Sequence, residues 1–209
     1  IILRNDAMAS ILGAFAGMFS ADAAQKGLSP LAGREGEDMA AECVTLMDDP
    51  LYPINPSPFD DEGTPSVAKA VIKDGKLETL LHNLKTAKKA GVKSTSNGGR
   101  SSAGSPVGVR ITNFYIAPKE GTLGQLISEL GDGLLITDFS GLHAGVNPVS
   151  GKFSVLCKGR LIKDGRDVRA VNEITLSGDF TELLRSIVRV GGDLRFSMPG
   201  GSCVGSPSV

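Results

Sequence analysis

The sequence of 209 residues predicts an α+β fold: a predominantly antiparallel sheet with hairpins and a few packed helices. Asp74-Gly75 and Asp164-Gly165 each lie between two apolar runs, and Asp-Gly in that position is a strong β-hairpin signal. The segments with helical periodicity do not alternate regularly with the strands. A parallel sheet of βαβ units is therefore not expected.

Composition and charge exclude several classes of protein. The hydrophobic fraction of 41% is too high for a disordered tail, and the 27 glycines have no collagen-like period. The formal net charge of −1 gives no global field that would hold nucleic acid or an anionic membrane. The longest apolar run, residues 7–19, is shorter than the roughly 20 residues of a membrane span. Three widely spaced cysteines indicate a reducing compartment, and so a cytoplasmic location.

The first helix is expected from about residue 5 to Gly27. Asn5 and Asp6 can cap its N-terminus, and Gly27 suits its C-terminal end. Its apolar face follows helical spacing and comprises Met8, Ile11, Leu12, Phe15, Met18 and Phe19. Its other face carries small residues, which would let a second backbone approach closely: Ala9, Gly13, Ala16 and Gly17.

Short strands and helices follow along the chain. Further helices are expected at residues 83–90, 122–130 and 179–190. Strands are expected at residues 43–47, 67–72, 77–81, 109–116, 134–137, 153–162 and 168–176. A Pro-rich acidic loop covers residues 52–65, and two Gly-rich loops cover residues 91–108 and 138–151. Loops this long inside a compact domain usually have a function.

Few residues suggest catalysis. A zinc-peptidase helix needs two His on one face, but His82 and His143 lie far apart and are expected to form ordinary hydrogen bonds. The acidic residues 60–62 are expected to cap, turn or pair with Arg. The basic run of Lys85, Lys88, Lys89, Lys93 and Arg100 is expected to be a solvated face, although it could contact phosphate.

Cys203 is the best isolated candidate for a ligand or a reactive thiol, because it follows the small residues 200–202. A buried, inert thiol is the more common situation for cysteine.

Several strings in the chain resemble the TldD/PmbA family, and its PmbA (TldE) branch in particular. They are residues 4–10 (RNDAMAS), 13–27 (GAFAGMFSADAAQKG), 60–64 (DDEGT), 81–83 (LHN), 112–115 (TNFY) and 141–151 (GLHAGVNPVSG). The resemblance covers nearly the whole chain. It implies that residues 1–209 are the C-terminal domain of such a protein, a fragment without the N-terminal domain and the final strands.

The resemblance implies a cytoplasmic protease of two related subunits. The TldD-type subunit carries an HExxxH zinc helix and a later Cys ligand, and the PmbA/TldE-type subunit lacks that helix motif. Aligned on the strings Lys-Gly and Gly-Arg at residues 26–27 and 33–34, the His positions fall on Leu12 and Gly17, and the Glu position falls on Gly13. The Cys position falls on Cys203, and one thiolate cannot supply three zinc ligands. No catalytic or metal residue is expected in this chain, and zinc is expected in the TldD-type partner.

The resemblance favours a non-catalytic partner subunit of a TldD/TldE-type zinc metalloprotease that acts on peptides and leader peptides. Its partners would be a TldD-like catalytic subunit and peptides, with a homodimer as an option for the isolated chain. Candidates for contacting the peptide or the partner lie in the Gly-rich loops: Asn97, Arg100, His143, Gly145 and Asn147. Two alternatives stay open. One is a metallopeptidase in its own right with an unrecognised site, and the other is a DNA gyrase-modulating or nucleic-acid-associated protein, against which the balanced charge argues.

Overall fold

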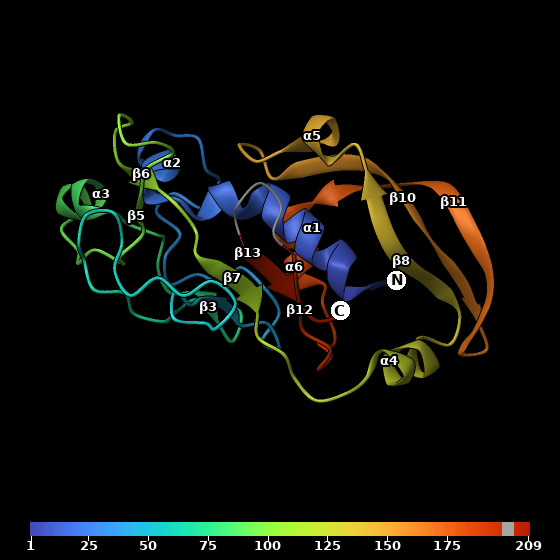
Figure 1. Ribbon diagram of the computed structural model, residues 1–209. Coiled ribbons are helices and arrows are strands. Elements are labelled where there is room, and N and C mark those ends of the chain that lie inside the picture. The colour runs from blue at the N-terminus through green and yellow to red at the C-terminus, as the bar shows by residue number, and fades with distance from the viewer. Residues whose placement is uncertain (198–202) are drawn as a thin grey trace.

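The computed structural model describes residues 1–197 and 203–209 and confirms the α+β fold with mostly antiparallel pairing (Figure 1). One sheet has the order β1-β8-β10-β11, with β9 paired to β10, and its only parallel pair within the described residues is β1 with β8. The strands of this sheet are β1 (Ile2–Leu3), β8 (Gly133–Ser140), β9 (Val146–Asn147), β10 (Lys152–Lys163) and β11 (Arg166–Asp179).

A second sheet has the order β12-β13-β7-β2-β3-β4, in which β13 and β7 run parallel. Its strands are β2 (Leu46–Asp48), β3 (Lys69–Lys73), β4 (Lys76–Leu77), β7 (Asn113–Ile116), β12 (Arg195–Ser197) and β13 (Cys203–Ser206). A separate two-stranded ladder pairs β5 (Gly98–Gly99) with β6 (Gly108–Val109). The helices are α1 (Asn5–Phe15), η1 (Ala16–Phe19), α2 (Ala21–Gln25), α3 (Leu84–Ala90), α4 (Leu123–Leu130), α5 (Leu142–Gly145) and α6 (Phe180–Arg185).

Helix α1 is the centre of the core. It contacts β8 and β9 of the first sheet and β12 and β13 of the second. Its expected apolar face is confirmed, because Met8, Ile11, Leu12 and Phe15 are fully buried. The ring of Phe15 stacks on Phe180 with 4.4 Å between ring centroids, which ties α1 to α6. On the small-residue side, Gly13 and Gly17 border open space, whereas Ala9 is buried in the core.

The two Asp-Gly hairpins are confirmed, and so are two of the helices. Asp74-Gly75 turns between β3 and β4, and Asp164-Gly165 turns between β10 and β11; all four residues have positive φ, as a type I′ turn requires. Helices α3 and α4 both begin with a capping box, in which Asn83 and Thr122 are the N-caps.

The first helix begins at Asn5, as predicted, but its N-cap and its C-terminal end differ from the prediction. Arg4 is the N-cap and makes no side-chain capping bond, while Asn5 is the first residue of the helix and its side-chain amide donates to Asp193. The helix does not run on to Gly27. It tightens into η1 and breaks at Ser20, whose backbone is extended and whose hydroxyl caps α2. The break lets the amide of Ala21 donate to the carbonyl of Leu81, a tertiary contact that the local pattern does not reveal.

Other boundaries also differ from the sequence prediction. Residues 138–151 are not a loop, since they hold the end of β8, α5 and β9, which pair or pack with β10. Likewise, the Ser/Gly-rich residues 91–108 contain β5 and the start of β6. Strand β2 begins at Leu46 rather than residue 43, and α6 ends at Arg185 rather than residue 190. For the first three segments, pairing with strands distant in sequence decided the boundary, whereas α6 ends in a local C-cap at Ser186.

The two ends of the described chain lie together (Figure 1). Leu3 and Val209 exchange two main-chain hydrogen bonds of 2.7 and 2.9 Å. Beside this pair, the hydroxyl of Ser208 donates to Asp193, and the amide of Asn5 donates to the Ser208 hydroxyl. These contacts fix the start of α1 against the second sheet. Among the described residues, no helix is long and apolar enough to cross a membrane.

Candidate binding cavity

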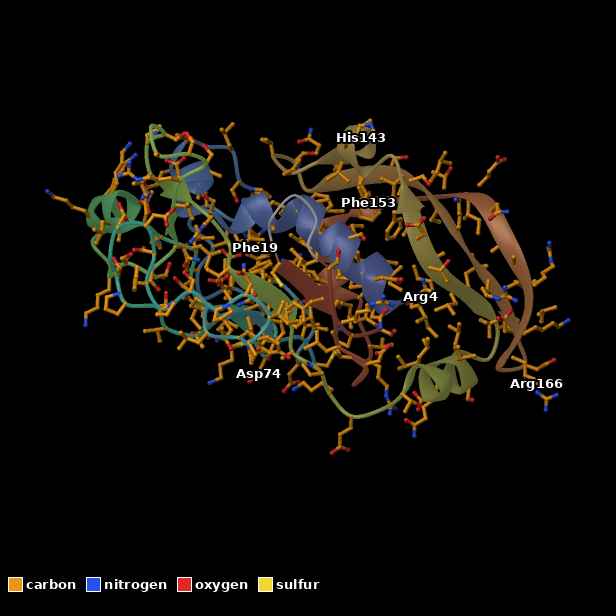
Figure 2. The ribbon with its side chains drawn as sticks, in the orientation of Figure 1. Arg4, Phe19, Asp74, His143, Phe153 and Arg166 are labelled. Carbon is orange, nitrogen blue, oxygen red and sulfur yellow. The ribbon has the colours of Figure 1, made fainter. Side chains whose placement is uncertain are left out.

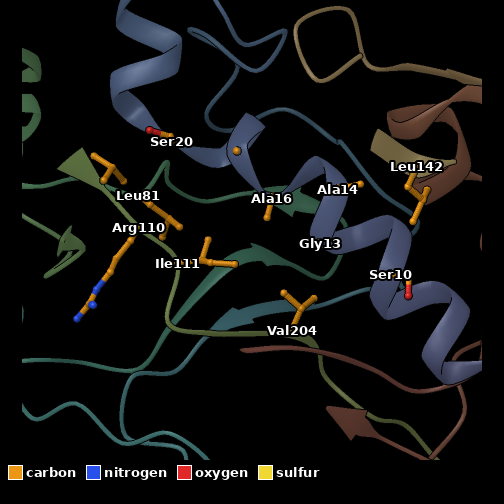
Figure 3. A pocket seen from close by; sticks show the side chains of 12 residues that line it. Ser10, Gly13, Ala14, Ala16, Ser20, Leu81, Arg110, Ile111, Leu142 and Val204 are labelled. Atoms are coloured by element: carbon orange, nitrogen blue, oxygen red, sulfur yellow. The ribbon is translucent and has the colours of Figure 1, made fainter. Parts of the chain in front are cut away.

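A cavity of about 570 Å³ lies along the small-residue side of α1 and η1 (Figure 3). One wall consists of small residues that share one side of α1 and η1: Ser10, Gly13, Ala14, Ala16 and Gly17. The facing wall is apolar and comes from distant parts of the chain: Leu81, Val109, Ile111, Leu142 and Val204. The volume falls in the range of small-molecule sites, about 300–1,000 Å³.

The two glycines of α1 and η1 keep this space open. A Cβ atom added at Gly13 would lie 3.6 Å from Cγ2 of Val204, at ordinary van der Waals distance. A Cβ atom at Gly17 would meet nothing within 4 Å. Neither glycine has a positive φ, so the backbone does not demand glycine here. The missing side chains therefore leave volume for something else.

The cavity offers contact surface rather than reactive groups. Of its lining residues, Arg110 alone carries a titratable side chain, and Figure 3 shows that side chain extending away from α1. Its guanidinium lies 3.8 Å from the carboxylate of Asp61. The hydroxyl of Ser10 donates to the carbonyl of Asp6 at 2.8 Å, and the hydroxyl of Ser20 caps α2. This arrangement suits apolar side chains of a bound ligand.

The positions that the resemblance assigns to the zinc helix do not share one face. Gly13 and Gly17 line the cavity, whereas Leu12 is fully buried in the core. Residues 12 and 17 are five apart, which on an α-helix separates their directions by about 140°. Among the described residues, no group of three His, Cys, Asp or Glu side chains could hold a metal ion.

Cys203 is described, while residues 200–202 before it lie outside the described residues. It is fully buried in β13, opposite Asn113 of β7. Burial raises the pKa of the Cys203 thiol, because the thiolate would lose its hydration. A protonated thiol is a poor nucleophile and a poor metal ligand.

The other candidates of the C-terminal Gly-rich segment lie elsewhere. Gly145 and Asn147 line a second recess of about 720 Å³ beside Phe153, not the cavity along α1. Oδ1 of Asn147 accepts hydrogen bonds from the amides of Val149 and Ser150 and so forms a turn. His143 is exposed on α5, at the outer surface in Figure 2.

Asn97 does not line the cavity, but it hydrogen-bonds to the backbone of Arg110 in the cavity wall. Its side chain is fully buried and donates to Oδ2 of Asp48 at 2.7 Å and to the carbonyl of Arg110 at 2.9 Å, while it accepts from Thr95. It thereby holds the segment that carries Val109 and Ile111.

Arg100 is exposed and does not line the cavity. Its backbone amide donates to the carboxylate of Asp61.

The non-catalytic interpretation of the acidic residues 60–62 is consistent with the structure. Asp60 accepts from the amides of Glu62, Thr64 and Gly98, and Oε2 of Glu62 accepts from the amide of Leu84 at the start of α3. Lys85, Lys88, Lys89 and Lys93 are all exposed, as a solvated face requires.

The sequence pointed to the small-residue wall but not to the facing wall. Gly13 and Gly17 were singled out as small positions and as zinc-helix positions. Leu81 and Leu142 lie inside strings that carried the resemblance, yet nothing in their spacing places them opposite α1. Such contacts between distant segments need the three-dimensional structure.

Helix α1 between two sheets, with an apolar cavity along its small-residue side, defines the class: an α+β domain whose cavity lining has no acid, base or nucleophile apart from serine hydroxyls. Residues 1–209 match the family model described as "PmbA/TldA metallopeptidase C-terminal domain". The chain therefore belongs to the PmbA/TldD family.

Three similar proteins illustrate the match. A protein of Archaeoglobus fulgidus named "Metalloprotease" is 35% identical over 90% of this chain and 43% of its own length. A Thermotoga maritima structure, whose name links it to modulation of DNA gyrase, has a TM-score of 0.89 and 39% identity over 99% of this chain and 48% of that one. TldE from Thermococcus kodakarensis has a TM-score of 0.87 and 28% identity over 100% of this chain and 48% of that one. The chain thus spans about half the length of these relatives or slightly less.

Proposed function

We propose that this chain is part of the non-catalytic subunit of a two-subunit, TldD/TldE-type zinc metalloprotease. In this proposal the subunit acts in the cytoplasm, pairs with a TldD-like catalytic subunit that holds the zinc, and helps to bind peptides, including leader peptides. When isolated, it would form a homodimer. The observation that carries the proposal is the open apolar cavity at Gly13 and Gly17, two of the positions that the resemblance assigns to the zinc helix.

The cavity supports peptide binding by its shape and chemistry. One wall is the small-residue side of α1 and η1, and the facing wall comes from β6, β13, α5 and the segments at Leu81 and Ile111. Such a space can take one or two apolar side chains of an extended peptide, whose remaining residues would reach the partner's zinc. This chain would supply affinity and position, and the partner would supply the Lewis acid and the activated water.

The free thiols are consistent with a cytoplasmic location. Cys43, Cys157 and Cys203 form no disulfide in the described residues. Burial raises the pKa of each thiol, which keeps all three protonated and slow to oxidise.

A peptidase assay tests the proposal against the alternative of an independent metallopeptidase. The full-length protein would be purified alone and together with a TldD-like subunit, and peptide cleavage would be measured with and without a chelator. We expect no cleavage by the protein alone and chelator-sensitive cleavage by the pair. Chelator-sensitive cleavage by the protein alone, with one zinc ion bound per chain, would contradict the proposal.

A further inference from the structure

One charged side chain stands at the rim of the apolar cavity along α1. Among the described residues that line the cavity, Arg110 alone carries a charge, and it lies between the apolar Val109 and Ile111. Figure 3 shows its side chain extending away from α1, and that side chain is 46% exposed. A ligand that fills the cavity with an apolar group therefore has a positive charge beside it, where the cavity meets solvent.

The position of Arg110 is fixed by Asn97 and Gly99. The amide of Arg110 donates to the carbonyl of Asn97 at 2.9 Å, and the side-chain amide of Asn97 donates to the carbonyl of Arg110 at 2.9 Å. Asn97 is itself fully buried and bonded to Asp48. The aliphatic stem of Arg110 packs over Gly99, where an added Cβ atom would lie 2.6 Å from Cγ of the arginine. Because residue 99 has no side chain, the stem has room to lie there.

The guanidinium of Arg110 is only loosely engaged by the fold. Among the described residues, its one ion pair is with Asp61 at 3.8 Å, which is beyond hydrogen-bond distance. The two side chains are 46% and 37% exposed, so this is a weak surface contact. Asp61 has a shorter bond elsewhere, because its Oδ2 accepts from the amide of Arg100 at 2.7 Å. A carboxylate that offered Arg110 two parallel hydrogen bonds would bind the guanidinium more strongly than Asp61 does.

We infer that Arg110 is a specificity-determining residue of the cavity and selects peptides that carry a carboxylate beside an apolar residue; this inference rests on the proposed function. The apolar side chain occupies the cavity, and the carboxylate pairs with the guanidinium at the rim. A peptide brings such a carboxylate either at its C-terminus or in an Asp or Glu side chain. A Lys or Arg of the peptide in the same place is repelled by Arg110.

The test is competition for peptide cleavage by the full-length protein paired with the TldD-like subunit. The pair cleaves a neutral fluorogenic reporter peptide, and the inhibition constants of two matched sets of neutral peptides with a single leucine are compared. In one set the leucine is C-terminal, as a free carboxylate or as an amide. In the other set the peptide is amidated, and Glu or Gln adjoins the leucine. At least one carboxylate peptide should bind about fivefold or more tightly than its neutral match, and the set that shows this ratio identifies the source of the carboxylate.

Three variants assign that ratio to the guanidinium. In Arg110→Gln the ratio should fall to within about twofold of one, because the bidentate partner is gone. Asp61→Asn should raise the ratio, since it removes the carboxylate that competes for Arg110 and keeps an oxygen that accepts from the amide of Arg100. Arg100→Gln is the matched control, because Arg100 is exposed but does not line the cavity, and it should keep the ratio of the unmodified pair. Added salt should lower the ratio of the unmodified pair.

Two results would overturn the inference while the proposed function stands. In one, the unmodified pair cleaves the reporter but binds the carboxylate and neutral peptides equally well. In the other, Arg110→Gln keeps the full ratio, whether or not binding as a whole becomes weaker. If Arg110→Gln does not fold, Asp61→Asn decides, and an unchanged ratio in that variant overturns the inference. If the unmodified pair does not form or does not cleave the reporter, the proposed function is wrong and the inference fails with it.

Discussion

Gly13 of α1 and Val204 of β13 face each other across one end of the cavity, and a Cβ atom at Gly13 would lie 3.6 Å from Cγ2 of Val204. The gap is therefore wide enough for a methyl group and is filled by neither residue. Glycine in the interior of a helix is less stable than alanine, because it loses more backbone entropy on folding. At residue 13 the chain therefore has the less stable residue, and the space beside Val204 stays open.

Gly13→Ala should raise the free energy of unfolding by about 0.5–1 kcal/mol. The new methyl group meets Val204 at ordinary contact distance, and the helix gains from the better propensity. Urea unfolding followed by circular dichroism measures the change. Gly75→Ala is the matched contrast, because Gly75 has a φ of +82° and its Cβ would lie 2.6 Å from the carbonyl oxygen of Ala40. That variant should lose more than about 1 kcal/mol, and a gain there would contradict the geometry of the turn.

Asp48→Ala should lower the free energy of unfolding by about 3–5 kcal/mol. Asp48 is fully buried and accepts hydrogen bonds from Lys69, Asn97 and Thr112, so its removal leaves buried donors and the ammonium of Lys69, whose side chain is 13% exposed, without this partner. Asp22→Asn, which breaks the surface pair with Lys26, should cost less than about 1 kcal/mol. Equal effects of the two changes in urea unfolding would contradict this account.

Acid should destabilise the protein through His82. Burial lowers the pKa of His82 below its ordinary value of 6.5, although the charge of Glu35 opposes the shift. His82 is only 5% exposed, and among the described residues its Nδ1 atom has no hydrogen-bond partner. The unfolded chain therefore binds a proton at higher pH than the folded one. The stability from the neutral ring is fully present above pH 6.5 and is lost as the pH falls through the lower folded-state pKa.

The measurement is the urea midpoint at about pH 7.5 and about pH 5, a range in which His is the side chain that ordinarily titrates. His82→Phe should fall less between the two pH values than the unmodified protein does. His143→Phe is the control, because His143 is exposed, and should fall as much as the unmodified protein. If His82→Phe and the unmodified protein behave alike, burial of His82 is not the source of acid sensitivity.

Local signals predicted the elements that local chemistry decides. The positive φ of Asp74 and Gly75 needs only those residues and their neighbours, and the capping boxes at Asn83 and Thr122 are complete within four residues. The break at Ser20 was missed, because it depends on hydrogen bonds with Leu81, about sixty residues away. For the same reason, residues 138–151 looked like a loop until their pairing with β10 became visible.

The sequence predicted one wall of the cavity but not the other. The small residues at positions 13 and 17 stood out in the sequence and in the family resemblance, whereas Val109, Ile111 and Val204 became a wall only through the fold. Asn97 was expected in a loop that touches a ligand, but its side chain is buried and holds the segment of Arg110 in place. A polar residue in a Gly-rich loop gives no local sign of which role it has.

The measurement that tests the cavity most directly is the peptide affinity of the full-length protein in complex with the TldD-like subunit, with Gly13→Leu compared to the unmodified protein. Gly104→Leu, in an exposed loop with nothing within 4 Å of its Cβ, is the matched control. A leucine at residue 13 would fill the cavity. We predict that the peptide Kd rises at least about tenfold, while the zinc content of the complex and the Kd of the control are unchanged. An unchanged peptide Kd with Gly13→Leu would contradict the account.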